Sequence, residues 1–327
     1  MSLCYTFIVN KPLDFIINLK DSRSNSIFNC APDLFLNEFV NPWSESFVHE
    51  SGSYKKTLTI LPTEGPDTVD DGRIVYNFNH DGFRSEDFTK THTGIHILFS
   101  GCSNSEGVGS PLETIWTKKL YNQIAQHTDT SGFFSLAKAG HGWQKIIVNF
   151  MIYGEKYGFP EFFFVMLPNI ARFWDWSPKE RMWYHVQSRP LKTQSYWQNY
   201  TKVGQDNFLT PRIVTPEAHK KDFINFYFGW KMFQKFCESK GVKMLWGCWD
   251  YPESINHNTF QNSKNYVHLT IEESVKFINK ARPTGKFEVD DLCRRDGHLG
   301  QLEHEYWMTK FLERIKTEKE FSSRLVF

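Results

Sequence analysis

Four short polar stretches hold the residue types that nucleophilic catalysis on an ester requires. Ser103 supplies a hydroxyl, and the glycine-rich stretch 138–142 (KAGHG) supplies flexible backbone amides. Asn169 adds a side-chain amide, and Asp296 and His298 add an acid and a base. A hydroxyl, an imidazole, a carboxylate and a set of hydrogen-bond donors are the parts of a serine hydrolase. These residue types therefore predict acyl transfer through a serine.

The hydropathy pattern indicates which elements position these stretches. Strand-like and helix-like segments alternate from residue 94 onward, which is typical of an α/β layered domain with a mostly parallel sheet. The first three expected strands end directly before the stretches of Ser103, Gly140 and Asn169. Because the carboxyl ends of parallel strands lie at one edge of the sheet, we expect the three stretches to share that edge. Ligands bind at this edge in such sheets. Strands are expected at 94–100, 133–137, 162–167 and 242–246, and helices near 114–125, 144–157, 217–239, 271–279 and 301–316.

In this order the stretches resemble the sequence blocks of the SGNH (GDSL-type) hydrolase superfamily, in particular its phage and bacterial members. The resemblance runs from Tyr76 to Ile315. It implies a three-layer α/β/α flavodoxin-like domain with a mostly parallel sheet. The resemblance is carried by a first block at 101–107 (GCSNSEG), a second at 136–140 (LAKAG), a third at 166–169 (MLPN), a fifth at 296–298 (DGH) and a lead-in at 76–84 (YNFNHDGFR).

The resemblance also implies a role for each candidate residue. Ser103 would be the nucleophile, His298 its general base, and Asp296 the group that orients the imidazole. The backbone N–H groups of Ser103 and Gly140 and the side chain of Asn169 would form the oxyanion hole. No cofactor and no metal ion is implied. The expected substrate is a small ester or an acylated carbohydrate, from which the enzyme would remove an O-acetyl group.

The sequence departs from the family's pattern at three positions. Cys102 stands where the family usually has Asp, and Ile170 follows the candidate Asn where an Asp is common. Only Gly297 separates Asp296 from His298, where two residues are usual. Glycine can allow a tighter loop that keeps the pair aligned. The alternative is a misaligned pair, and then a catalytically inactive scaffold that serves as a structural or glycan-binding component, for example in a phage virion.

Each candidate also has an ordinary structural interpretation. Clusters of Gly, Ser and Asn are often simple turns, and an Asn after a strand often only satisfies a turn. Asp296 precedes a predicted helix and could cap it. Together with His298 and His304 it could also hold a metal ion, although no supporting Cys/His spacing accompanies them. For His141, a second histidine beside the candidate residues, we expect a substrate contact or a plain surface position.

The chain is expected to divide into two regions and one insertion. Residues 1–90 are rich in turns between short β-prone runs and predict an irregular β-rich N-terminal extension, while 91–327 would form the SGNH hydrolase-like α/β domain. An aromatic-rich insertion around 170–216 is longer than an ordinary connection. Its rings could cover the pocket as a sugar-stacking lid, or fill core or an oligomer interface. They include Phe173, Trp174, Trp176, Trp183, Tyr184, Tyr196 and Trp197.

Composition limits the classes of partner. The 327 residues carry 38 Lys and Arg against 37 Asp and Glu, a net charge of +1, so nucleic acid is not an expected partner. The longest apolar run, 162–167, is far shorter than the roughly 20 residues that span a bilayer, and no basic segment precedes the apolar N-terminal residues. We therefore expect no membrane partner and a cytoplasmic or virion-associated location, with a homo-oligomer or virion assembly as possible contexts. Six scattered cysteines without a C-x-x-C pair are expected to be reduced.

Overall fold

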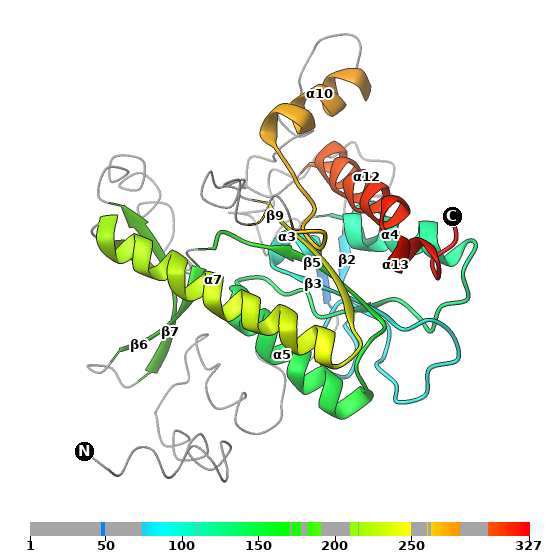
Figure 1. Cartoon of the computed structure of the whole chain (residues 1–327), viewed down its shortest axis with the longest axis horizontal. Coiled ribbons are helices and arrows are strands. Elements are labelled where there is room, and N and C mark those ends of the chain that lie inside the picture. The colour runs from blue at the N-terminus through cyan, green and yellow to red at the C-terminus, as the bar shows by residue number, and fades with distance from the viewer. Residues whose placement is uncertain are drawn as a thin grey trace.

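A four-stranded, all-parallel sheet forms the centre of the protein (Figure 1). The computed structural model describes residues 47–49, 74–76, 78–108, 110–170, 172–177, 182–190, 210–214, 216–249, 260, 263–281 and 300–327. In space the strands of the sheet follow the order β4-β3-β5-β9. Their bounds are β3 (Ile97–Gly101), β4 (Phe134–Ser135), β5 (Phe162–Leu167) and β9 (Lys243–Cys248).

The strands are buried because helices cover both faces of the sheet. Every residue of β3, β4 and β5 is buried, as expected for near-continuous apolar strands in a parallel sheet. Figure 1 shows two helices along one side of the sheet, α5 (Trp143–Tyr157) and α7 (Pro216–Ser239). On the other side lie α4 (Trp116–Ala125) and α12 (Gln301–Thr317). The predicted three-layer α/β fold is thus confirmed.

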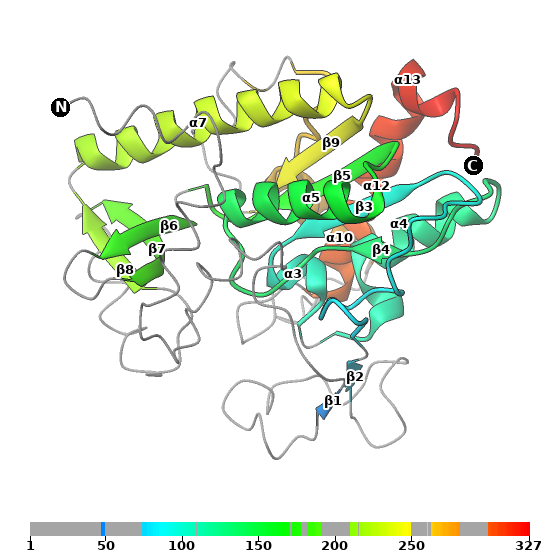
Figure 2. The ribbon, with the colours of Figure 1, turned by 90° about the horizontal axis from the view of Figure 1, so that it is seen from below.

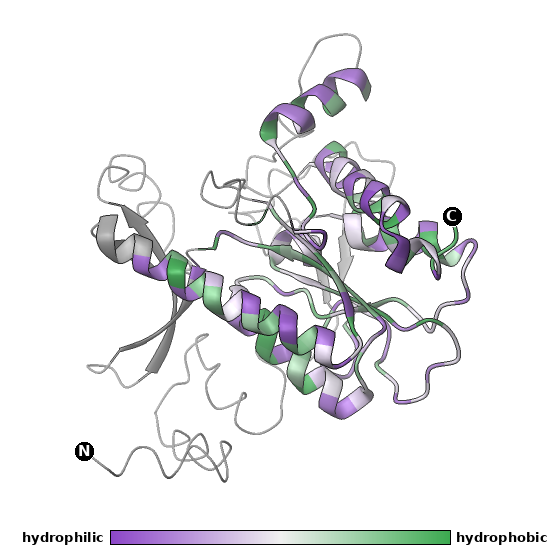
Figure 3. Ribbon diagram, viewed as in Figure 1, coloured by the Kyte–Doolittle hydropathy of each residue, from purple (hydrophilic) through white to green (hydrophobic). Residues whose placement is uncertain are grey.

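The alternation of side chains along each strand divides the core in two. Leu98, Phe163 and Val165 pack in the cluster that also holds residues of α5 and α7. Phe99 and Phe164, one position along each strand, pack in the second cluster with residues of α4 and α12. Figure 3 shows the matching pattern on the helices, where apolar and polar residues alternate along α5, α7 and α12. This amphipathic pattern is what a helix covering one face of a sheet requires.

The order of the strands creates a switch point at one place in the sheet. From β3 the chain crosses to β4 on one side, and from β4 it passes to β5 on the other side of β3. In register, Gly101 at the end of β3 lies beside Met166, one residue before the end of β5. The loops that follow β3 and β5 therefore leave the same edge of the sheet and diverge. In doubly wound sheets this is where ligands bind.

The insertion and the N-terminal region contain strands of their own. Within 170–216, β6 (Arg172–Ser177) pairs antiparallel with β7 (Met182–Pro190), and β7 pairs in parallel with β8 (Thr210–Val214). Helix α7 extends past the central sheet and contacts β7 and β8 (Figure 2). In the N-terminal region two short strands, β1 (Phe47–His49) and β2 (Ile74–Tyr76), form an antiparallel pair.

The structure leaves two of the predictions about these regions open. Most of the predicted N-terminal extension lies outside the described residues, and the boundary at residue 90 stays a prediction. Tyr196 and Trp197 lie outside them as well, so the choice between a lid and an interface is also open.

Among the described helices, none has the length and hydropathy to span a bilayer. The other described helices are α3 (Ser103–Glu106), η1 (Leu112–Thr114), α10 (Ile271–Ala281) and α13 (Lys319–Ser322).

Candidate functional site

Ser103 lies at the start of a tight strand-to-helix turn. It is the first residue of α3, directly after the extended and fully buried Cys102. Gly101 ends β3 where only glycine fits, because a Cβ there would lie 2.8 Å from the backbone oxygen of Met166 and against the Ser105 hydroxyl. As the first residue of the helix, Ser103 has an N–H for which the helix provides no acceptor. The turn thus presents a hydroxyl and an N–H at the carboxyl edge of β3.

Arg84 holds the other end of this turn. Its Nη1 donates hydrogen bonds to the backbone oxygens of Gly107 at 2.9 Å, Ser110 at 2.9 Å and Glu106 at 3.2 Å. The side chain is buried, and Gly107 takes the left-handed conformation (φ 76°) that ends a helix. Charge-assisted hydrogen bonds are stronger than neutral ones. One guanidinium therefore fixes the backbone that follows Ser103.

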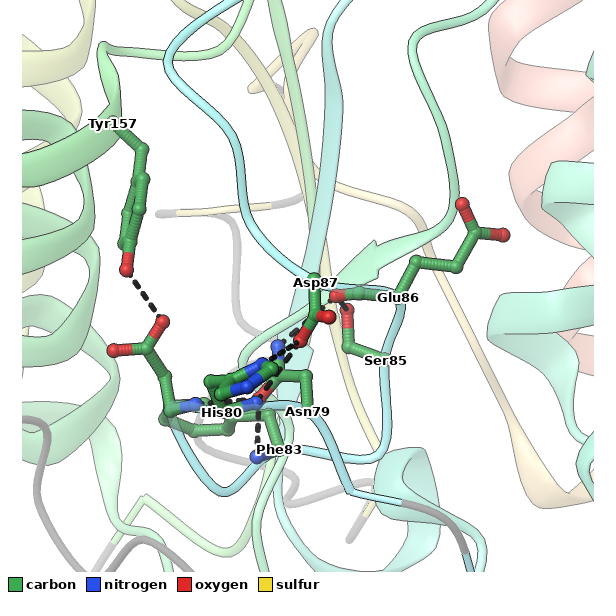
Figure 4. A network of polar contacts seen from close by, with 8 residues as sticks. Asn79, His80, Phe83, Ser85, Glu86, Asp87 and Tyr157 are labelled. Carbon is green, nitrogen blue, oxygen red and sulfur yellow. Dashed lines mark hydrogen bonds and ion pairs between the residues drawn. The ribbon is translucent and has the colours of Figure 1, made fainter.

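Arg84 is itself held by the folded loop 79–87, which Figure 4 shows. The Asn79 side chain accepts hydrogen bonds from the N–H groups of Asp81 at 3.1 Å and Phe83 at 2.9 Å. Phe83 is fully buried in the core, and Asp81 accepts a hydrogen bond from the Tyr157 hydroxyl at 2.6 Å. The loop, which contains Arg84, is thereby attached to α5. The structural role of the lead-in stretch is to place this arginine.

The second candidate loop follows β4 and is attached to the first. Lys138 donates its N–H to the backbone oxygen of Gly101 at 3.2 Å. Its Nζ forms an ion pair with Glu106 Oε1 at 2.9 Å, and the N–H of Ala139 donates to Glu106 Oε2 at 2.6 Å. The side chains of Lys138 and Glu106 are only 4% and 3% exposed. Burial lowers the pKa of Lys138, and the charge of Glu106 opposes that shift. Gly140 comes next, with φ 77°.

Asn169 follows β5 on the other side of Ser103. It lies after the buried Pro168, and its backbone oxygen accepts a hydrogen bond from the N–H of Arg172 at 2.9 Å. Because β3 lies between β4 and β5, the turn of Ser103 lies between the loops of Gly140 and Asn169. All three candidates are partly exposed, whereas the residues before Ser103 and Asn169 are buried.

Asp296 and His298 lie outside the described residues, which resume at Gly300. His304 in the first turn of α12 accepts a hydrogen bond from the N–H of Trp116 at 3.3 Å. The indole of Trp116 donates to the hydroxyl of Ser105 at 3.1 Å. The start of α12 is thus linked through Trp116 to the helix that begins with Ser103.

The structure changes the interpretation of two other histidines. His141 is fully buried, so the predicted plain surface position is wrong. The loop turns inward here, because the N–H of His141 donates to the backbone oxygen of Lys138 and Gly142 begins the entry into α5. The metal alternative included His304, which is buried and accepts the hydrogen bond from Trp116. No group of three or more His, Cys, Asp or Glu side chains suited to a metal ion occurs among the described residues.

No protein-family model and no curated protein matches the chain. What the structure shows is therefore the α/β fold with its four-stranded parallel sheet, and the resemblance to SGNH hydrolases remains an interpretation of the motifs.

The sequence did not indicate the residues that join the candidate loops. Glu106 and Lys138 lie 32 positions apart, and Arg84 lies 22 positions before Glu106. Each of the three belongs to a stretch that carries the resemblance, but no spacing pairs them. The contact of Glu106 with Lys138 joins the loops that follow the paired strands β3 and β4, and a single sequence does not reveal that pairing.

Proposed function

We propose that the protein is a serine esterase of the SGNH (GDSL-type) kind, which removes a small acyl group such as an O-acetyl group from a carbohydrate. The observation that carries the proposal is the position of three loops with complementary chemistry at one edge of the sheet. Because β3 lies between β4 and β5, the turn that carries Ser103 lies between the loops of Gly140 and Asn169. In doubly wound sheets this edge at the switch point is the site of ligand binding.

In the proposed reaction His298 acts first as a base and then as an acid in each half-reaction. Ser103 Oγ attacks the ester carbonyl carbon while His298 takes the hydroxyl proton, and Asp296 stabilises the imidazolium that forms. The N–H groups of Ser103 and Gly140 and the amide of Asn169 donate to the oxyanion of the tetrahedral intermediate. Collapse breaks the bond to the alcohol, which receives the proton from His298. Water then hydrolyses the acyl-enzyme by the same sequence of proton transfers.

The anchoring of α12 supports His298 as the base. His304 is fixed to Trp116, its N–H donates to the backbone oxygen of Gly300 at 3.1 Å, and Trp116 contacts Ser105. His298 precedes Gly300 by two residues, and two residues of chain span at most about 7 Å. The proposed base would thus follow a chain path of two residues from the helix end that Trp116 links to Ser105.

The second candidate function is the inactive scaffold that binds glycan or serves as a structural component. The single residue between Asp296 and His298 favours it, because a shifted imidazole would leave the Ser103 hydroxyl without a base. The two functions differ in whether Ser103 turns over an ester.

Hydrolysis of p-nitrophenyl acetate decides between them. We expect the wild-type protein to release p-nitrophenol at least 10³ times faster than Ser103→Ala, because removal of a triad member leaves only binding and the oxyanion hole. Ser323→Ala, an exposed serine near the C-terminus, is the matched control and should retain the wild-type rate. Equal rates for the wild type and Ser103→Ala would exclude the esterase.

A further inference from the structure

One carboxylate joins the helix of Ser103 to the loop of Gly140. Glu106 is the last residue of α3, and each of its two oxygens accepts a hydrogen bond from the loop after β4. Oε1 accepts a hydrogen bond from the Lys138 ammonium at 2.9 Å, and Oε2 accepts one from the N–H of Ala139 at 2.6 Å. Ala139 directly precedes Gly140. Glu106 therefore bonds the peptide unit directly before that of Gly140 to the helix that begins with Ser103.

The cost of this arrangement indicates that stability alone does not explain it. Glu106 and Lys138 are nearly completely buried, and a buried ion pair loses much of its attraction to desolvation. An apolar pair of similar volume at such positions is often equally stable. An apolar pair would, however, leave the N–H of Ala139 without this acceptor. What the carboxylate adds is a directional bond to the backbone beside Gly140.

Further hydrogen bonds hold the backbone around Glu106 and Lys138, next to the bond at Ala139. Arg84 holds the carbonyl of Glu106, and the N–H of Lys138 is bonded to the carbonyl of Gly101. Gly140 adopts a positive φ of 77°, which residues other than glycine seldom take. The bond at Ala139 holds the chain where it enters this unusual conformation.

We propose that Glu106 is a positioning residue that holds the Gly140 N–H in the oxyanion hole, with its charge balanced by the buried ion pair to Lys138. The inference rests on the proposed esterase function. The bound ester carries no oxyanion, and the negative charge develops only as the reaction proceeds, so loss of the positioning should lower kcat and leave KM unchanged. Displacement of a catalytic group by about 1 Å can cost about 100-fold in rate.

Two double variants separate positioning from stability. Glu106→Gln/Lys138→Met removes both charges and keeps an amide oxygen for the N–H of Ala139. Glu106→Leu/Lys138→Met removes both charges and the acceptor as well. Both pairs are neutral and similar in volume, so neither leaves an unpaired buried charge. We expect the Gln variant to retain kcat within about threefold of the wild type, and the Leu variant to lose about 10-fold to 100-fold in kcat with an unchanged KM.

Backbone amide exchange provides a readout that does not depend on activity. The amides of residues 137–142 should exchange faster in the Leu variant than in the Gln variant, while those of β5 exchange equally in both. The inference is overturned if both variants have the same kcat and the same exchange in 137–142. It is also overturned if exchange rises equally across the sheet, since the pair is then only structural. If the wild type hydrolyses no ester, the proposed esterase function is wrong. The exchange rates of amides 137–142 in the two double variants then still decide whether Glu106 fixes the loop.

Discussion

Acid should destabilise the fold through His96, which lies just before β3. The ring is buried, stacks on His92 with 3.6 Å between ring centroids, and shares a hydrogen bond of 2.7 Å with the Tyr153 hydroxyl. Phe134 packs edge-on against it. Burial, and secondarily the charge of His92, lowers the pKa of His96 from 6.5 to about 3. The folded protein therefore binds a proton at His96 far less readily than the unfolded chain does.

The sign and size of the effect follow from this difference. Between pH 6.5 and about 3 the unfolded chain is protonated at His96 and the folded protein is not, so stability falls as the pH falls. The slope is about 1.4 kcal/mol per pH unit, which amounts to about 2 kcal/mol between pH 6.5 and 5. In a domain of this size such a loss lowers Tm by roughly 4 to 8 °C.

Urea unfolding at several pH values between 7 and 5 measures the effect. Because carboxylates also titrate toward the acid end, the informative quantity is the difference between the wild type and His96→Gln, which can still bond to Tyr153. We expect the variant to lose about 2 kcal/mol less than the wild type over this range. His127→Gln, at an exposed position, is the control for replacing a histidine by glutamine. Parallel slopes for the wild type and His96→Gln would refute the reasoning.

Two further predictions concern the site. Asn169→Ala should lower kcat for p-nitrophenyl acetate by about 10²-fold to 10³-fold without changing KM, since it removes an oxyanion donor; an unchanged kcat would exclude Asn169 from the oxyanion hole. Gly101→Ala should destabilise the protein by about 1 to 3 kcal/mol in urea unfolding, because the added Cβ meets a backbone oxygen of the sheet, that of Met166. Gly247→Ala on β9 is its control, because its nearest neighbours at 3.0 and 3.3 Å are side-chain atoms that can move; equal losses in the two variants would contradict the crowding argument.

The elements that carry the sheet could be predicted from the sequence because their signals are local. The run FFFVML is continuously apolar, and its predicted bounds, 162–167, coincide with β5. The edge strand β4 has only two residues paired with β3, so the predicted strand 133–137 was longer than the observed one. β9 pairs with β5 over its whole length and extends two residues beyond the predicted end.

The sequence of the insertion shows no regular alternation of apolar and polar residues, although the insertion contains strands. In β6 and β7 aromatic residues occupy consecutive positions, as in Phe173 with Trp174 and Trp183 with Tyr184, and this obscures the alternation that marks a strand. The register pairs Trp176 with Trp183, a relation that depends on where the chain turns.

The order of the candidate loops was predictable, and their connections were not. Ser103, Gly140 and Asn169 follow strands, so their common edge follows from a parallel sheet. The burial of His141 and the pairing of Glu106 with Lys138 depend on how two loops fold over that edge. Local sequence carries no signal for such contacts.

The most direct test of the central claim is the position of a covalent adduct. The native protein is treated with a fluorophosphonate, digested, and mapped by mass spectrometry, with Ser103→Ala treated in parallel. We expect one adduct, on Ser103, and none in the variant, because only an activated serine reacts. An adduct on another serine of the native protein, or no adduct at all, would contradict the assignment of Ser103 as the nucleophile.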